Sequence, residues 1–384
     1  MLLKKLIPQF IKDLKVKYEY RPINNLYKTN YDKKAILSYI TDPFRTHSLN
    51  HTNHFEVKMW AKILHELGFQ VDIIQFNLLP SSLNLDKYNL ICGFGDIFQN
   101  YFENTNCSAQ TIYYGAGMHV CHQNYASLQR VKDVYIKKNV WLAKSSRFVE
   151  KTWSHQTTLV DGIIALGNEI CSDSYKKYYD GKVLSQPALF YKTQDIKVIM
   201  KNRREESRKH FLWFGSSGSI HKGLDLLLEY FSKNKNITLH ICGTVSNEPE
   251  FVEIYKKELY ETENIITYGF IDIKSKKFTN ILSSCSFVVY PSCSEGGSPS
   301  ALTVIGNGGL IPIISKETTI STGNEIWIDS LNDAGINKAI KKALSLKYEE
   351  IIYLQNKNYN YVNLNHSQKS YYKQLKINIK NILG

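Results

Sequence analysis

Short apolar strands alternate with amphipathic helices along this chain, in two runs separated by a basic connector. In the first run the segments AILSYIT, FEVKMWAKILHELGF and QVDIIQF predict a strand, a helix and a second strand. NLICGFG and TIYYGAG follow as further strands. Parallel strands need a crossover connection, and a helix supplies it. The alternation therefore predicts an α/β fold with parallel sheets covered by helices.

The same alternation begins again at residue 210. The predicted strands HFLWFGS, ITLHICG, IITYGFI, SFVVYPS and LIPIIS are separated by helical segments such as KGLDLLLEYFSK and EPEFVEIYKKELYE. A chain of 384 residues is too long for one core, because single cores stop growing near about 250 to 300 residues. We therefore predict two doubly wound domains, residues 1–195 and 205–365, joined through the basic segment 187–210, followed by a final segment, 366–384.

The composition excludes some classes of protein. Hydrophobic residues make up 43% and charged residues 22%, which is typical of a packed chain and excludes a disordered one. The net charge of +13 favours an anionic partner such as a nucleotide, a nucleic acid or an acidic membrane surface, and the alternative is a compositional bias towards lysine. No basic segment is interleaved with aromatic residues, so nucleic acid is not an expected partner.

Several features bear on the location of the chain. It has no cleavable leader and no apolar run of about 18 residues, so neither secretion by that route nor a membrane span is predicted. Seven cysteines without a C-x-x-C pair favour the reducing cytoplasm over a disulfide framework or a zinc ribbon. Residues 1–18 form a basic amphipathic pattern, which predicts either packing on the protein's own surface or association with a membrane surface.

A solitary carboxylate marks the second half of the chain. Glu295 is the only charged residue between positions 278 and 315, in the segment PSCSEGGSPSALT that follows an apolar strand. An unpaired buried charge is costly, so we expect Glu295 to meet water, a donor or a polar ligand. Gly296 and Gly297 allow a ligand to approach the backbone, and Ser298 is placed to cap the next helix. The segment predicts a phosphate or diphosphate pocket, and the alternative is a tight turn.

A glycine loop with a lysine, FGSSGSIHKGLD, opens the second run. Lys222 precedes Gly223, so the loop is not a Walker motif, and it lacks the dinucleotide fingerprint as well. A lysine at the start of a helix can neutralise the growing charge of a leaving diphosphate. The alternative is an exposed lysine that begins a helix.

Histidines gather at two places in the first run. His119 and His122 follow the strand TIYYGAG, at the sheet edge where ligands of α/β folds bind. His51 and His54 precede a helix and are expected in the same cleft. The four histidines are also candidate metal ligands, but zinc-binding helices prefer i, i+4 spacing and no cysteine pair supports a site. Capping and hydrogen-bonding roles are favoured.

Together the segments FLWFGS, HKGLDLLLEYF, ITLHICG, NIITYGFI and FVVYPSCSEGGSPSALTVIGNGGLIPIIS resemble the retaining nucleotide-sugar glycosyltransferases of the GT-B fold, family 4. The resemblance covers most of residues 210–316 and extends more loosely to YITDPFRTHSLNHTNHFEVKMWAKILHELGFQVDI and YYGAGMHVCHQN. It implies two Rossmann-like domains that face a cleft, and a C-terminal helix, HSQKSYYKQLKINIKNIL, that crosses back to the first domain.

The resemblance also implies an activity, the transfer of a sugar from a nucleoside-diphosphate donor to an acceptor hydroxyl, with retention and with no cofactor or obligatory metal. Lys222 matches the family's diphosphate-binding lysine, Glu295 a carboxylate that contacts donor-sugar hydroxyls, and His119 a histidine that faces this sugar. These three are the expected catalytic residues. The expected donor-binding residues are Gly215, Ser216, Gly218, Lys222, Gly269, Phe270, Ile271, Glu295, Gly296, Gly297, Ser298 and Thr303. The expected acceptor-side residues are His51, Asn53, His54 and His122.

Two positions depart from the family pattern. Thr303 stands where a second glutamate is expected, which leaves the ribose contact to its hydroxyl or to Glu317. Ser216 stands where an arginine is expected after Gly215, so Lys222 and helix N–H groups would have to neutralise more of the diphosphate charge.

The expected acceptor is a glycan or a lipid-linked molecule, in bacterial surface polysaccharide or lipopolysaccharide synthesis at the cytoplasmic face of a membrane. Two other readings share the fold, because fold alone does not choose chemistry. One is a nucleotide-sugar epimerase. The other is a module that binds a nucleotide sugar or a glycan without turnover.

Overall fold

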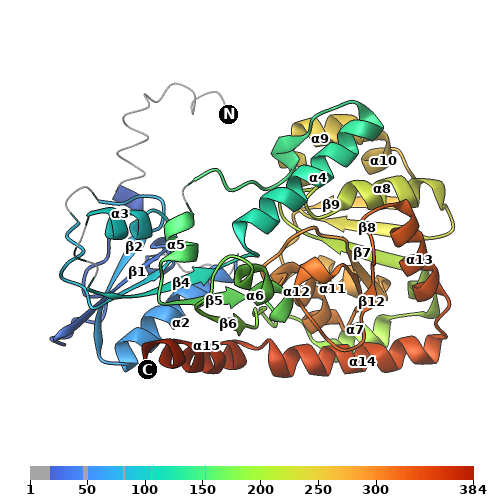
Figure 1. Ribbon diagram of the computed structural model, residues 1–384. Helices are drawn as coiled ribbons and strands as arrows, with labels where there is room; N and C mark the ends of the chain where they lie inside the picture. The colour runs from blue at the N-terminus through green and yellow to red at the C-terminus, as the bar shows by residue number, and fades with distance from the viewer. Residues whose placement is uncertain (1–17, 46–50, 81–82, 105, 107, 152) are drawn as a thin grey trace.

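A computed structural model of the protein describes residues 18–45, 51–80, 83–104, 106, 108–151 and 153–384. Two parallel six-stranded sheets, each flanked by helices, lie side by side (Figure 1). The predicted α/β class and the two doubly wound domains are confirmed. The predicted amphipathic segment, residues 1–18, lies outside the described residues except for its last residue.

The first sheet has the strand order β2-β1-β3-β4-β5-β6, and every pair is parallel. Its strands are β1 (Lys33–Tyr39), β2 (Phe69–Gln75), β3 (Leu90–Gly93), β4 (Gln110–Gly115), β5 (Gly162–Leu166) and β6 (Lys182–Gln186). The helices between these strands in the sequence are α2 (Asn53–Glu66), α3 (Ile97–Asn104), α4 (Val120–Lys138), α5 (Ser154–Thr158) and α6 (Glu169–Lys176). Residues 35–39 of β1 are buried on both faces of the sheet, as expected of a strand inside a parallel sheet.

The second sheet has the order β12-β11-β10-β7-β8-β9. Its strands are β7 (His210–Phe214), β8 (Thr238–Cys242), β9 (Ile265–Gly269), β10 (Phe287–Tyr290), β11 (Ile311–Ile314) and β12 (Ile326–Trp327). Its helices are α8 (Leu224–Lys233), α9 (Pro249–Ile254), α10 (Lys256–Tyr260), α11 (Lys276–Ser284), α12 (Pro299–Gly308) and α13 (Asp333–Leu344). The strand order reverses between β7 and β10, and such a switch point opens a crevice at the carboxyl ends of the strands.

The elements differ from the sequence prediction in three places. The segment interpreted as a connector contains helix α7 (Ile196–Asn202), which the Asp195 side chain caps by accepting from Lys197 N and which buries Ile199. The single helix expected over residues 248–261 is two helices, α9 and α10, joined at the fully buried Tyr255. Strands β5, β6 and β12 were not predicted, although β5 is a buried apolar run of the same length as β7.

The chain ends in two helices along the base of both sheets, α14 (Tyr348–Asn365) and α15 (Gln368–Leu383) (Figure 1). α14 packs against α12, whereas α15 packs against α2 and β6. Gln186 Nε2 donates to the Tyr371 carbonyl at 3.2 Å, and the hydroxyls of Tyr371 and Tyr114 lie 3.1 Å apart in the first core. The expected C-terminal helix that crosses back to the first domain is confirmed.

Helix α4 belongs to the first run in sequence but lies over the helices of the second sheet (Figure 1). Its buried Arg130 Nη2 is 2.5 Å from the Asp225 carboxylate at the start of α8. Beyond the helix, the Ser145 carbonyl accepts from Ile220 N at 2.9 Å. The predicted domain limits place residues 120–147 in the first domain, yet these contacts tie them to the second.

The structure also bears on the membrane span and the disulfide framework that the sequence did not favour. Among the residues that the structure describes, no helix has the length and apolar character needed to cross a membrane. Six of the seven cysteines lie in the described part of the chain, and all six are unpaired.

Candidate functional site

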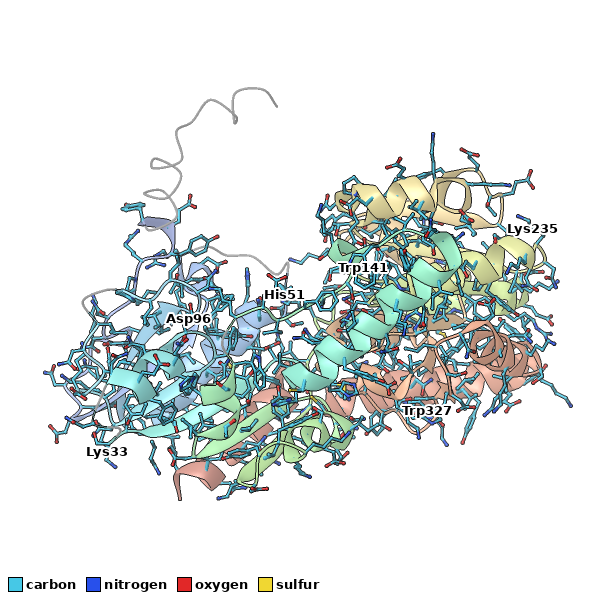
Figure 2. The ribbon with its side chains drawn as sticks, turned by 45° about the horizontal axis from the view of Figure 1, so that its top comes forward. Lys33, His51, Asp96, Trp141, Lys235 and Trp327 are labelled. Carbon is cyan, nitrogen blue, oxygen red and sulfur yellow. The ribbon has the colours of Figure 1, made fainter. Side chains whose placement is uncertain are left out.

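A cavity of about 710 Å³ lies beyond the carboxyl ends of β7, β8 and β9. Five predicted donor-binding residues line it, namely Gly215, Ser216, Phe270, Ile271 and Thr303. His51 and Thr52, at the start of α2, line it from the first domain, and Figure 2 shows His51 between the two sheets. The cavity therefore lies between the domains, where the doubly wound topology places a ligand.

The other predicted donor residues lie outside this lining, but Lys222 stands directly behind it. A Cβ atom built on Gly215 would lie 3.2 Å from Lys222 Cδ. Lys222 Nζ is 3.3 Å from Glu295 Oε1, and both side chains are buried. Tyr290 Oη and Ser292 Oγ donate to the same Oε1 atom at 3.3 and 3.1 Å. The structure thus brings together the two residues that the sequence singled out on separate loops.

The charges of this pair depend on each other. Burial lowers the pKa of the Lys222 ammonium to about 8, although the Glu295 carboxylate offsets part of that shift. Burial alone would raise the pKa of Glu295, but the charges of Lys222 and Arg147 outweigh it and lower this pKa. Glu295 is therefore ionised at neutral pH, and Lys222 is the group that titrates just above neutrality.

Two backbone N–H groups of the glycine loop are paired within the protein. Gly218 N donates to Glu248 Oε1 at 2.6 Å, and Ser219 N donates to the same carboxylate at 3.2 Å. These N–H groups are occupied by a side chain of the protein itself. An anion at this loop would therefore have to pair with other groups.

The start of α12 also differs from expectation. Ser298 occupies the N-cap position with φ 34°, and its side chain makes no capping hydrogen bond. Gly297 N donates to Thr319 Oγ1 at 2.7 Å, so this N–H group is occupied too. The expectation that Ser298 caps the helix is wrong, because its left-handed backbone does not match that of an ordinary cap. The first turn still reaches the cavity through Pro299 and Ser300.

Gly296 and Gly297 are needed where the two domains touch. A Cβ atom on Gly296 would lie 2.3 Å from the Ala116 carbonyl oxygen, and one on Gly297 would lie 2.4 Å from Ala188 Cβ. Gly297 also has φ 64°, which a residue with a side chain rarely adopts. In this arrangement the glycines bring the Glu295 loop against the first domain.

The two positions considered for the ribose contact have separate locations. Thr303 lines the cavity, and its Oγ1 donates to the Pro299 carbonyl at 2.7 Å. Glu317 is not among the lining residues, and its charge acts on His122. Asp272, which sequence reasoning missed, is the only carboxylate among the described residues that line this cavity. Its position just after β9, next to the expected donor-binding residues Phe270 and Ile271, was the available signal.

His119 is packed among aromatic rings. Its ring stacks on Tyr178 with centroids 4.3 Å apart and contacts Trp153 edge-on. Nδ1 accepts from Cys121 N at 3.2 Å and so caps α4. Burial lowers the pKa of His119 to about 4, which makes the ring neutral, and Nε2 is buried with no partner among the described residues. His119 does not line the cavity, and its expected contact with a donor sugar stays a prediction.

The expected acceptor-side residues divide between two places. His51 lines the cavity, whereas His54 Nε2 lies 3.5 Å from the Asp42 carboxylate. Asn53 begins α2, and its backbone N–H donates to His51 Nδ1 at 3.3 Å. His122 lies on α4. Across the described residues, no three His, Cys, Asp or Glu side chains gather in a way that could hold a metal ion, so the histidine metal site finds no support.

Solved structures of other proteins have a similar fold. The structure of HepE from Anabaena in complex with UDP matches 91% of this chain and 100% of its own, with 10% identity and a TM-score of 0.59. A glycosyltransferase from Rickettsia africae matches 92% of this chain and 99% of its own, with 13% identity and a TM-score of 0.53. The chain has the GT-B fold.

This chain spans 57% of the length of the pneumococcal O-GlcNAc transferase GtfA. The match covers 77% of this chain, with 17% identity and a TM-score of 0.49. No protein-family model matches the sequence, and no curated protein matches it either.

Proposed function

We propose that this GT-B protein is a glycosyltransferase that moves a sugar from a nucleoside-diphosphate donor to an acceptor hydroxyl. The observation that carries the proposal is the buried Lys222–Glu295 pair directly behind the wall of the interdomain cavity. Lys222 supplies charge to a diphosphate, and the carboxylate of Glu295 suits sugar hydroxyls. HepE was solved with UDP, which makes UDP the first nucleotide to try.

Retention at the anomeric carbon is the stereochemistry that we propose. A double displacement needs a carboxylate nucleophile beside the sugar. The Glu295 carboxylate is paired with Lys222 Nζ at 3.3 Å. Asp272, the only carboxylate among the described lining residues, follows β9, two strands away from β7 and so roughly 10 Å along the sheet. This favours a front-face route in which the leaving phosphate oxygen takes the proton of the acceptor hydroxyl. The two domains hold donor and acceptor together and exclude water.

The function has a direct test. A panel of UDP, GDP, ADP, CDP and CMP is screened by thermal shift, and UDP at about 100 times its Kd should stabilise the protein by roughly 2.7 kcal/mol. The matching sugar nucleotide is then incubated with candidate acceptors, and the product anomer is read by NMR. We expect transfer with retention, whereas an inverted product would refute the front-face route.

The alternative readings give different results in the same assay. An epimerase would convert the sugar nucleotide with no acceptor present. A binding module would show the thermal shift but no product with any acceptor. A chain that no nucleotide stabilises would contradict the proposed function itself.

We propose that the acceptor is a glycan or a lipid-linked molecule at the cytoplasmic face of a bacterial membrane. The support is a set of exposed apolar side chains on α4, namely Leu128, Tyr135 and Ile136. Trp141, also exposed, lies just beyond the helix (Figure 2). The exposed Lys132 lies on α4 as well. Apolar and basic side chains together suit an anionic membrane surface.

The membrane proposal is tested by sedimentation with vesicles. We expect binding to phosphatidylglycerol vesicles and little binding to phosphatidylcholine vesicles, since basic residues select anionic lipid. Ile136→Ser and deletion of residues 1–18 should each weaken it. Equal recovery of wild-type protein with and without anionic vesicles would remove the membrane from the proposal.

A further inference from the structure

The guanidinium of Arg147 reaches the cavity wall from the first half of the chain. Its Nη2 donates to Ser216 Oγ at 3.3 Å and to the Ser217 carbonyl at 3.2 Å. Its Nη1 lies 4.0 Å from Glu295 Oε2. Ser216 lines the cavity, and the charge of Arg147 acts on His51 across it. Arg147 thus stands between the glycine loop and the Glu295 loop, beside both domains.

The position of Arg147 is set by contacts with the second domain. Ser127 Oγ, on α4, donates to the Arg147 carbonyl at 2.8 Å and lies 3.1 Å from His221 Nδ1. Burial lowers the pKa of His221 to about 3, so the ring is neutral, and its Nε2 donates to the Ser294 carbonyl. One buried histidine therefore joins α4, the glycine loop and the Glu295 loop. Arg147 is thereby fixed relative to the loop that carries Lys222.

The charges around the glycine loop show what Arg147 adds. Lys222 is paired with Glu295, and the Glu248 carboxylate takes the N–H groups of Gly218 and Ser219. The two carboxylates, Glu295 and Glu248, carry one negative charge more than Lys222 offsets, and the positive charge of Arg147 offsets it. Without it, an anion at this wall would meet a net negative surrounding, which Coulomb repulsion disfavours.

We propose that Arg147 binds the diphosphate of the donor, in the place where Ser216 leaves the glycine loop without a charge. The planar guanidinium has paired N–H donors that match phosphate oxygens. It is 40% exposed, so it can turn from the Ser216 hydroxyl towards a ligand in the cavity. A residue of the first half of the chain therefore completes the donor site of the second. This inference rests on the proposed function.

The test removes the arginine at position 147 and introduces one at position 216, the two sides of the Arg147–Ser216 contact. UDP binding is measured by calorimetry for wild type, Arg147→Ala, Ser216→Arg and the double variant Arg147→Ala/Ser216→Arg. We expect Arg147→Ala to weaken UDP roughly tenfold or more, as loss of a charged hydrogen bond predicts. Ser216 Oγ is 3.3 Å from the guanidinium, so an arginine at 216 should restore affinity in the double variant to within about threefold of wild type.

Matched controls separate this role from structural damage. Lys144→Ala removes a positive charge from the same segment, but Lys144 is 84% exposed and pairs with Glu250, so UDP affinity should not change. Unchanged melting temperatures would show that the Arg147 variants fold. Arg147→Ala with wild-type affinity, or a double variant as weak as the single one, would overturn the inference while UDP binding by wild type leaves the proposed function standing. Wild type that binds no nucleotide would overturn both.

Discussion

Lys222→Met is expected to weaken UDP binding by about 100-fold at pH 7. The change removes a charged donor worth roughly 1.5–3 kcal/mol, and it leaves the Glu295 carboxylate facing the phosphates. Because burial holds the pKa of Lys222 near 8, wild-type affinity should be greatest below pH 8 and fall as the lysine loses its proton. The variant should lose this pH dependence. Calorimetry between pH 6.5 and 9.5 measures both effects.

The paired change Lys222→Met/Glu295→Gln is the control. Lys222→Met alone leaves a buried carboxylate without its lysine and should also lower the melting temperature. The double variant removes both charges, so stability should recover while UDP binding stays weak. If Lys222→Met binds UDP as tightly as wild type across the pH range, the lysine does not contact the donor and the proposed site is wrong.

Arg130→Met is expected to lower the free energy of unfolding by about 3–5 kcal/mol, because it leaves a buried charge unpaired. The Arg130–Asp225 pair is 2.5 Å long, with side chains 4% and 2% exposed. It joins α4 to α8, so its loss should also release α4 from the second domain. Urea unfolding, followed by circular dichroism, measures the change.

Two further variants at the contact between α4 and α8 test why Arg130→Met should lower the free energy of unfolding. Arg130→Met/Asp225→Leu removes both charges and should recover most of the stability, since a buried pair is often replaceable by apolar residues. Lys137, on α4 like Arg130, is 37% exposed and pairs with Glu229 of α8. Lys137→Met should therefore lower the free energy of unfolding by less than about 1 kcal/mol after solvent screening. An Arg130→Met protein as stable as wild type would show that α4 is held by other contacts.

Much of the fold could be predicted because its signals are local. The apolar runs around Ala35, Phe211 and Phe287 are strands within one or two residues of the predicted limits, and glycine loops follow two of them. Lys222 and Glu295 could be singled out as well, since each is a charged residue in a glycine-containing loop after an apolar strand. Their 3.3 Å contact follows from the parallel pairing of β7 and β10, which brings both loops to one sheet edge.

The sequence by itself determined the α/β class, the two sheets and the loops that carry Lys222 and Glu295, because periodicity and glycine placement act over a few residues. Only the tertiary structure decided which groups are free to meet a ligand. Glu248 occupies the N–H groups of the glycine loop, and Arg147 stands beside Ser216 from 69 residues earlier in the chain. No local pattern marks either residue, since both placements depend on how distant helices pack against the second sheet.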